Sequence, residues 1–194
     1  MKNIIFDIGG VIFLEKSNSV LNKFNIKEED IKELSIFFEN TEKLDKGLQT
    51  VEERFESCNF RKELVDKYKN IIINYYKFKE VNNELLDIIK KLKDKYNFYI
   101  LSDNGKNFEN YIKKKSFYNH FSGSVFSCDY STMKKEGKLF EILITKYNLD
   151  PKESLFIDDI EINIEKAKEY GLNTYRFKCN EDLIKYLKDN KLLD

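Results

Sequence analysis

The stretch KNIIFDIGGV at residues 2–11 constrains the fold more than any other part of the chain. A short apolar run ends on a carboxylate, Asp7, and the glycines Gly9 and Gly10 follow it. Four to eight apolar residues bounded by glycine predict a buried strand, usually in a parallel sheet. Asp7 would then lie at the carboxyl end of a central strand, where ligands bind in open α/β sheets. An Asp that begins a turn fits the same fragment, so the rest of the chain must decide.

Composition excludes several classes of partner. The 194 residues predict one large domain, or one domain with a modest insertion. Lys and Arg together number 34, as do Asp and Glu, so the charge balance favours neither nucleic acid nor an acidic membrane surface as a partner. No apolar run approaches the roughly 20 residues that span a bilayer. The first residues form a predicted strand and lack the pattern of a signal peptide.

The cysteines indicate a reducing compartment. Cys58, Cys128 and Cys179 are scattered without metal-type spacing, which is typical of a reduced cytoplasmic protein. We expect a cytoplasmic location and a monomer or weak homodimer. The single histidine, His120, follows an aromatic segment near a predicted turn, and a structural or surface role is the simplest interpretation.

Residues 14–80 contain no convincing strand. Apolar residues recur at helical spacing over residues 31–38, and a second helical pattern runs from Leu64 to about Phe78. Between them, Thr50 and Glu53 have the spacing of a capping box at the start of a helix. This segment therefore predicts an all-helical block.

After residue 80, helices and strands alternate. Predicted strands cover residues 98–102, 124–127, 154–159 and 174–177, and predicted helices lie between and after them. This alternation is typical of an α/β fold, a doubly wound parallel sheet. We expect a core domain of residues 1–13 and 81–194, interrupted by a helical cap domain of residues 14–80.

Polar residues follow the predicted strands. Asp7 ends the first strand, Ser102 the second, and the pair Asp158–Asp159 the fourth, while Lys134 follows the third. Each has an ordinary structural explanation, but adjacent carboxylates repel unless a cation or proton intervenes. Parallel strands bring all five residues to one edge of the sheet. A nucleophile, a hydroxyl donor, a cation and a metal site together favour phosphoryl transfer.

These segments resemble the four motifs of the haloacid dehalogenase superfamily, in order and at suitable spacing. They are residues 7–11, residues 101–103, Lys134 and residues 156–159. The helical block resembles the family's cap, and residues 46–50 resemble the cap loop of small bacterial sugar-phosphate phosphatases. The resemblance covers nearly the whole chain and implies a Rossmann-like core.

The resemblance implies a role for each motif residue. Asp7 would attack phosphorus, and Mg²⁺ would be held by Asp7, the Gly9 carbonyl and Asp159, with Asp158 binding directly or through water. Ser102 and the backbone N–H of Asp103 would hold phosphate oxygens. Lys134 would neutralise charge on the phosphoryl group and on Asp7. The cap would exclude water and select the leaving group.

Two positions depart from the family pattern. The usual second aspartate, which protonates the leaving oxygen, is Gly9 here, and losing general acid catalysis costs perhaps 10²–10⁴-fold in rate. Some phosphatase branches that resemble this chain also have glycine there, and an aryl phosphate or sugar 1-phosphate depends less on an acid. The third motif, usually Lys-Pro-Asp, reads Lys134-Lys135-Glu136, so Lys135 is an alternative for the motif lysine.

The sequence thus predicts a Mg²⁺-dependent phosphatase acting on a small phosphorylated metabolite, such as a sugar phosphate. One alternative is a 2-haloacid dehalogenase, which would use Asp7 on carbon without metal. Another is a catalytically impaired phosphate-binding or regulatory protein, which only Gly9 favours. The cap cations Lys46 and Arg54 are further, weaker candidates for substrate contacts.

Overall fold

The protein is described by a computed structural model that covers residues 1–14 and 17–193. Its centre is a five-stranded parallel sheet with the strand order β3-β2-β1-β4-β5. The strands are β1 (Asn3–Phe6), β2 (Asn97–Ser102), β3 (Gly123–Phe126), β4 (Ser154–Asp158) and β5 (Asn173–Arg176). The predicted α/β fold is confirmed, and the strand at residues 2–11 is its central strand.

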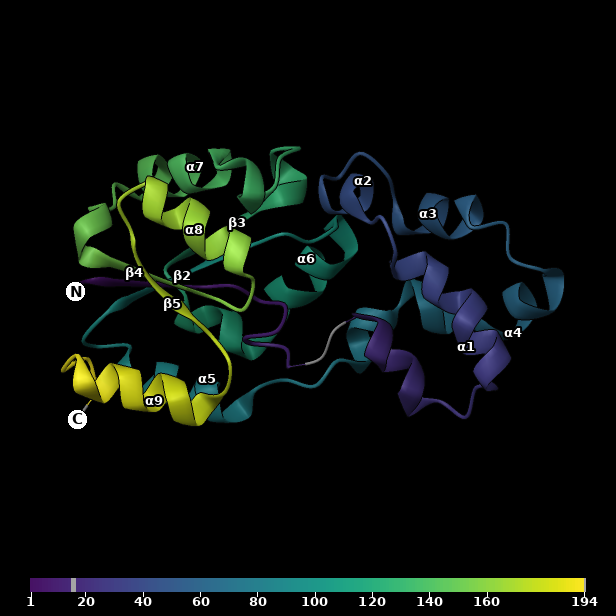
Figure 1. Ribbon diagram of the computed structural model, residues 1–194, viewed down its shortest axis with the longest axis horizontal. Helices are drawn as coiled ribbons and strands as arrows, with labels where there is room; N and C mark the ends of the chain where they lie inside the picture. The colour runs from purple at the N-terminus through teal and green to yellow at the C-terminus, as the bar shows by residue number, and fades with distance from the viewer. Residues whose placement is uncertain (15–16, 194) are drawn as a thin grey trace.

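Helices cover both faces of the sheet (Figure 1). The sheet-covering helices are α5 (Asn83–Leu92), α6 (Lys106–Lys113), α7 (Lys138–Tyr147), α8 (Glu161–Glu169) and α9 (Asn180–Asp189). Alternate residues of a strand point to opposite faces. Ile4 and Phe6 accordingly belong to a cluster with apolar residues of α5, α6 and α9, whereas Ile5 packs with those of α7 and α8. Burial on both faces explains why the strands read as continuous apolar runs.

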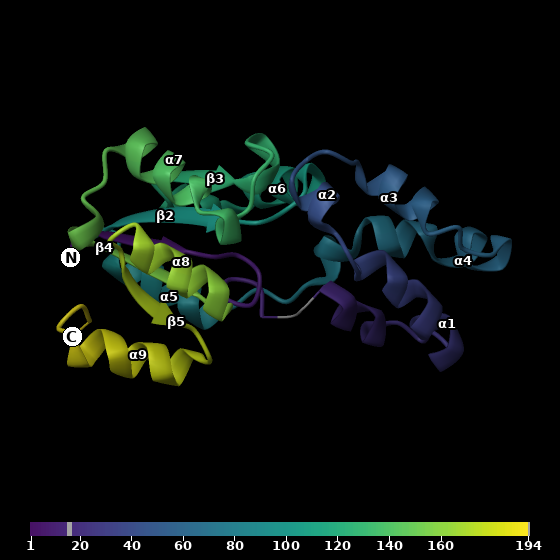
Figure 2. The same ribbon diagram turned by 45° about the horizontal axis from the view of Figure 1, so that its top comes forward.

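A separate helical lobe lies at one end of the molecule, far from both termini (Figures 1 and 2). It contains α1 (Glu28–Leu34), α2 (Glu42–Asp45), α3 (Val51–Ser57) and α4 (Lys62–Ile73), packed around their own apolar cluster. The predicted capping box at the start of α3 is confirmed: the Glu53 N–H donates to Thr50 Oγ1, and the Thr50 N–H donates to Glu53 Oε2. The domain boundaries at residues 13 and 80 stay a prediction.

Two predicted helices are shorter than expected. The helix predicted to reach Phe78 ends at Ile73, and the pattern at residues 31–38 breaks after Leu34. Short 3₁₀ turns follow at Ser35–Phe38 and Tyr75–Phe78. They bring the rings of Phe37, Phe38 and Tyr75 into edge contact, with centroids 5.1–6.1 Å apart. Apolar spacing alone did not distinguish these turns from continued α-helix, because both periods place similar residues on one face.

The strand register aligns the ends of β1 and β4. Phe6 pairs with Ile157, so Asp7 and Asp158 follow at the same level, and the Asp7 N–H donates to the Ile157 carbonyl at 2.9 Å. Ser102 ends the neighbouring strand β2 on the other side of β1. Within the described ranges, no helix has the length and apolar character needed to cross a membrane.

Candidate active site

Lys134 joins the ends of β1 and β4. Its ammonium lies 2.8 Å from Asp7 Oδ1 and 2.6 Å from Asp158 Oδ2. All three side chains are buried, with Lys134 only 2% exposed. A buried ammonium needs compensating charges, and two carboxylates provide them. Burial alone would lower the pKa of Lys134, but these charges outweigh it and raise the pKa, which favours the protonated ammonium. Lys134, and not Lys135, is therefore the lysine at the site; Lys135 pairs with Glu42 at 2.8 Å.

Ser102 supports Asp7 from the side of β2. Its hydroxyl donates to Asp7 Oδ1 at 2.7 Å and receives a hydrogen bond from Asn104 Nδ2 at 2.6 Å. Ser102 is fully buried, whereas Asp103 and Asn104 line the adjoining cavity. The carboxylate of Asp103 accepts the backbone N–H of Lys134 at 3.0 Å, which fixes the loop that carries the lysine.

Three hydrogen-bond partners hold the carboxylate of Asp158 in place. Its Oδ1 accepts the Ile160 N–H at 2.8 Å, and Asn163 Nδ2, from the first turn of α8, reaches Oδ2 at 3.1 Å. Lys134 provides the third partner. Because these bonds satisfy both oxygens, Asp158 is oriented rigidly toward the cluster.

The three carboxylates fit a divalent cation. One oxygen each from Asp7, Asp158 and Asp159 lie within 4.8 Å of one another. Carboxylate oxygens are the ligands that Mg²⁺ prefers. Gly10 allows Asp159 to come close to the other two carboxylates, because a Cβ built at Gly10 would lie 2.4 Å from Asp159 Oδ2. Its φ of +76° is also one that glycine adopts without strain.

Burial dominates the electrostatics of the nucleophile candidate. It raises the pKa of Asp7 to about 7, while Lys134 and the hydrogen bond from Ser102 oppose the shift and Asp158 adds to it. Burial also raises the pKa of Asp103, against the effect of Lys134. The site therefore concentrates negative charge that a cation would stabilise.

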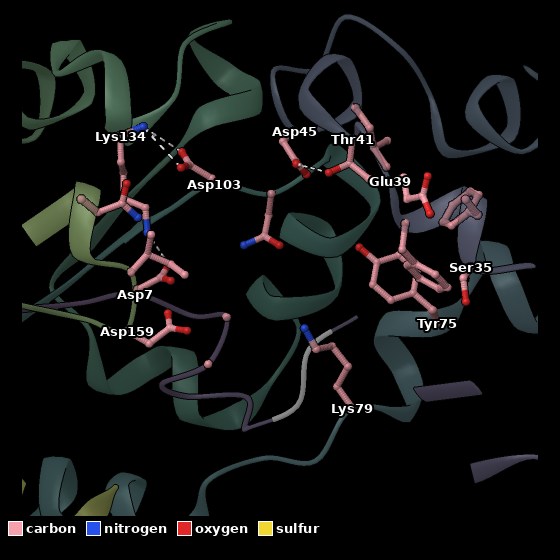
Figure 3. A pocket seen from close by; sticks show the side chains of 18 residues that line it. Asp7, Ser35, Glu39, Thr41, Asp45, Tyr75, Lys79, Asp103, Lys134 and Asp159 are labelled. Carbon is pink, nitrogen blue, oxygen red and sulfur yellow. Dashed lines mark hydrogen bonds and ion pairs between the residues drawn. The ribbon is translucent and has the colours of Figure 1, made fainter. Parts of the chain in front are cut away.

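A cavity of about 550 Å³ separates this cluster from the helical lobe (Figure 3). Asp7, Gly9, Lys134 and Asp159 line it on the sheet side, and Ser35, Glu39, Thr41, Asp45, Tyr75 and Lys79 line it opposite. The sequence analysis missed these lobe residues and Asn104. Asn104 could have been predicted from the sequence, because it lies two residues beyond Ser102. The lobe residues could not, because no local sequence pattern places them near Asp7.

The two predicted cap cations are not among the residues that line the cavity. Lys46 pairs with Glu136 at 2.5 Å and with Glu42 at 2.9 Å. Arg54 instead donates to backbone carbonyls of the lobe, including that of Phe37 at 3.0 Å. Both side chains thus have structural partners.

Comparisons with known proteins show the family of the chain. The family model of haloacid dehalogenase-like hydrolases matches residues 1–171. A curated relative, D-ribitol-5-phosphate phosphatase of Bacteroides thetaiotaomicron, is 26% identical, and the match covers 91% of each chain. A solved HAD family enzyme from the same organism, in complex with magnesium and inorganic phosphate, is 29% identical with a TM-score of 0.69, covering 94% of this chain and 96% of that one.

A more distant structure shares the fold. The L-2-haloacid dehalogenase of Xanthobacter autotrophicus is 14% identical with a TM-score of 0.65, covering 100% of this chain and 85% of that one. At this identity, the likeness shows the fold alone. The family model, in contrast, spans β1 through α8 and includes every motif described above. The chain belongs to the haloacid dehalogenase-like hydrolases.

Proposed function

We propose that the protein is a Mg²⁺-dependent phosphatase that hydrolyses a small phosphorylated metabolite. The observation that carries the proposal is the arrangement of Lys134 between Asp7 and Asp158, with Asp159 close enough to share one cation. A dianionic phosphate needs several positive groups around it, and an ammonium beside a divalent-cation site provides them. The phosphatase relative and the magnesium–phosphate complex support this interpretation.

In this mechanism, an oxygen of Asp7 attacks phosphorus, the bond to the leaving oxygen breaks, and the alkoxide takes a proton from solvent water to leave as the alcohol. The product is an aspartyl-phosphate, which water then hydrolyses to inorganic phosphate and free Asp7. Lys134 stabilises the charge on the transferring group, and Ser102 holds Asp7 in position. Mg²⁺, held by Asp7, Asp159, the Gly9 carbonyl and, directly or through water, Asp158, would supply electrostatic stabilisation of the phosphate oxygens.

The leaving oxygen receives no help from residue 9. A Cβ built on Gly9 would have no atom within 4 Å, so this position opens onto free space where a carboxylate would otherwise project. We therefore expect slower turnover of alkyl phosphates than of aryl phosphates, whose leaving groups need no acid.

The direct test is hydrolysis of p-nitrophenyl phosphate with 5 mM MgCl₂ or with EDTA, for the wild type and Asp7→Asn. Asp7→Asn keeps the shape of the side chain and its hydrogen bond from Ser102 but removes the nucleophile. We expect turnover that requires both the metal and Asp7. Asp66→Asn, at an exposed position of α4, is the matched control and should behave as wild type.

The same test, extended to 2-chloropropionate, distinguishes the two alternative functions. Metal-independent release of chloride from 2-chloropropionate would instead establish a dehalogenase. A folded protein that binds Mg²⁺ and phosphate but turns over neither substrate would indicate a regulatory or phosphate-binding role.

A further inference from the structure

The cavity extends well beyond the carboxylate cluster, and its far wall belongs to the helical lobe (Figure 3). A phosphate held by Lys134 and the cation site would occupy only the sheet side. The group esterified to that phosphate must then extend toward the lobe. The lobe residues therefore determine which leaving group fits.

Asp45 is the lobe carboxylate held most firmly at this wall. It is the last residue of α2, and its Oδ2 accepts the hydroxyl of Thr41 at 2.7 Å, one turn earlier. Its backbone carbonyl accepts the Ser127 hydroxyl from the sheet side at 2.5 Å. Asp45 is thus fixed to both parts of the molecule, so its carboxylate can act as a fixed reference point for a ligand.

The charge of the far wall argues against a second anionic group on the substrate. Among the described residues that line this wall, Asp45 and Glu39 are acidic and Lys79 is basic. The ammonium of Lys79 lies 5.4 Å from the centre of the Phe108 ring, and Lys46 and Arg54 are engaged elsewhere. A carboxylate or second phosphate would meet two carboxylates there against the single ammonium of Lys79, which costs affinity.

The wall suits hydroxyl groups instead. A carboxylate accepts hydrogen bonds on two oxygens, and the Thr41 oxygen, whose proton goes to Asp45, can accept a further one. Phe37, Leu44 and Tyr75 supply apolar surface for the carbon chain. Burial raises the pKa of Asp45 to about 6, with Asp103 and Glu42 adding to the shift and Thr41 and the Lys79 ammonium opposing it. Near neutral pH, Asp45 is thus an ionised acceptor with little water around it, which strengthens a hydrogen bond from a ligand.

We propose that Asp45 is a specificity-determining residue that accepts a hydroxyl of the leaving group, so that the substrates are phosphate monoesters of uncharged, polyhydroxylated alcohols. This inference rests on the proposed phosphatase function and adds the chemical class of its substrate. It assigns the selectivity to one side chain of the lobe.

The test compares substrates that differ in charge at one carbon. Glycerol 3-phosphate and 3-phosphoglycerate share their skeleton, but the second carries a carboxylate where the first carries a hydroxymethyl group. Ribitol 5-phosphate extends the neutral series, and p-nitrophenyl phosphate reports the phosphoryl-transfer step. We expect wild-type kcat/KM to favour glycerol 3-phosphate over 3-phosphoglycerate by about 10-fold or more, since like charges at close range are strongly unfavourable.

Asp45→Asn is the decisive variant, because it keeps the shape and an acceptor oxygen but removes the charge. We expect the ratio of kcat/KM for ribitol 5-phosphate to that for p-nitrophenyl phosphate to fall about 10- to 100-fold, mainly through KM. The preference for glycerol 3-phosphate over 3-phosphoglycerate should narrow at the same time. Asp66→Asn should change neither ratio.

Three results would overturn the inference while leaving the phosphatase function intact. One is Mg²⁺-dependent turnover of p-nitrophenyl phosphate by a wild type that prefers 3-phosphoglycerate. Another is an equal fall in kcat/KM for every substrate in the Asp45→Asn variant, which would indicate a structural role. The third is unchanged ratios in a folded variant. If Asp45→Asn does not fold, the wild-type preference decides alone. Loss of all turnover in the wild type would instead reject the phosphatase proposal.

Discussion

At the scale of single residues, the two glycines after Asp7 have opposite requirements. Gly9 faces open space, whereas Gly10 has a positive φ and leaves no room for a Cβ beside Asp159. The strand-end pattern located both, but only the structure distinguishes their surroundings.

We expect Gly9→Ala to retain most of the wild-type activity and Gly10→Ala to lose it. The Gly10→Ala methyl group would displace the Asp159 carboxylate and strain the backbone, costing about 1–3 kcal/mol in the free energy of unfolding. The measurements are Mg²⁺-dependent hydrolysis of p-nitrophenyl phosphate and urea denaturation. Equal losses in the two variants would contradict the arrangement described for Asp159.

Asp45 should make stability depend on pH. Its pKa is about 6 in the folded protein against 3.8 for the ordinary carboxyl, so the folded state holds the proton more tightly. Stability therefore falls as pH rises from about 4 to about 6 and stays lower above that range.

Because Asn does not ionise, the Asp45→Asn variant should not show this fall in stability between about pH 4 and about pH 6. We expect the variant to be more stable than wild type at pH 8, by at most about 3 kcal/mol, and nearly equal to it at pH 4. Thermal melting of both proteins across this range measures the difference, with Asp66→Asn as the control. A stability difference that does not vary with pH would show that Asp45 does not titrate as described. Stabilisation by removal of a site residue is typical of functional positions.

At the scale of elements, the loop after α2 joins the lobe to the sheet. Gly47 has a φ of +67°, and a Cβ there would lie 2.5 Å from the carbonyl oxygen of Cys128. Two ion pairs, Lys46–Glu136 and Lys135–Glu42, cross the same junction. The predicted cap loop is therefore the place where the lobe closes one side of the cavity.

Gly47→Ala should separate the lobe from the sheet at this point. We expect kcat/KM for phosphorylated polyols to fall about 10²-fold, since small displacements of positioning groups are costly, while the free energy of unfolding falls by about 1–2 kcal/mol. Steady-state kinetics measures kcat/KM, and urea denaturation measures the free energy of unfolding. Gly171→Ala, which also has a positive φ but meets only Pro151 Cβ at 3.6 Å, is the matched control. If both variants lose activity equally, the junction has no special role.

At the scale of the whole molecule, we expect the carboxylate cluster to couple folding to the binding of the proposed metal ion. Bringing Asp7, Asp158 and Asp159 together costs repulsion, which the ion pairs of Lys134 with Asp7 and Asp158 oppose. A ligand that binds only the folded state adds stability by mass action.

We expect MgCl₂ at about 100 times its dissociation constant to add about 2.7 kcal/mol, which raises Tm by roughly 5–10 °C for a chain of this size. Asp159→Asn should abolish most of the shift. Differential scanning calorimetry measures this shift in Tm, with CaCl₂ in place of MgCl₂ as a comparison. An identical shift in Asp159→Asn would place the metal elsewhere. The cytoplasmic location and the monomeric or weakly dimeric state stay predictions.

The sequence alone determined the parallel sheet, the place of Asp7 at the end of its central strand, and the convergence of Ser102, Lys134 and Asp158 on that edge. These features follow from short-range patterns, because strand periodicity and parallel topology together fix which residues meet. It did not determine the ends of α1 and α4, where ring packing replaced α-helix with 3₁₀ turns.

Only the tertiary structure decided how the lobe faces the sheet. It brought Asp45 and Thr41 across the cavity from Asp7, and it directed Lys46 and Arg54 into ion pairs and hydrogen bonds instead of the cavity. The physical reason is that contacts between distant segments depend on the packing of whole helices, and no local spacing in the chain encodes them. The proposed nucleophile, Asp7, could therefore be predicted from the sequence, whereas the proposed hydroxyl acceptor, Asp45, emerged only from the folded molecule.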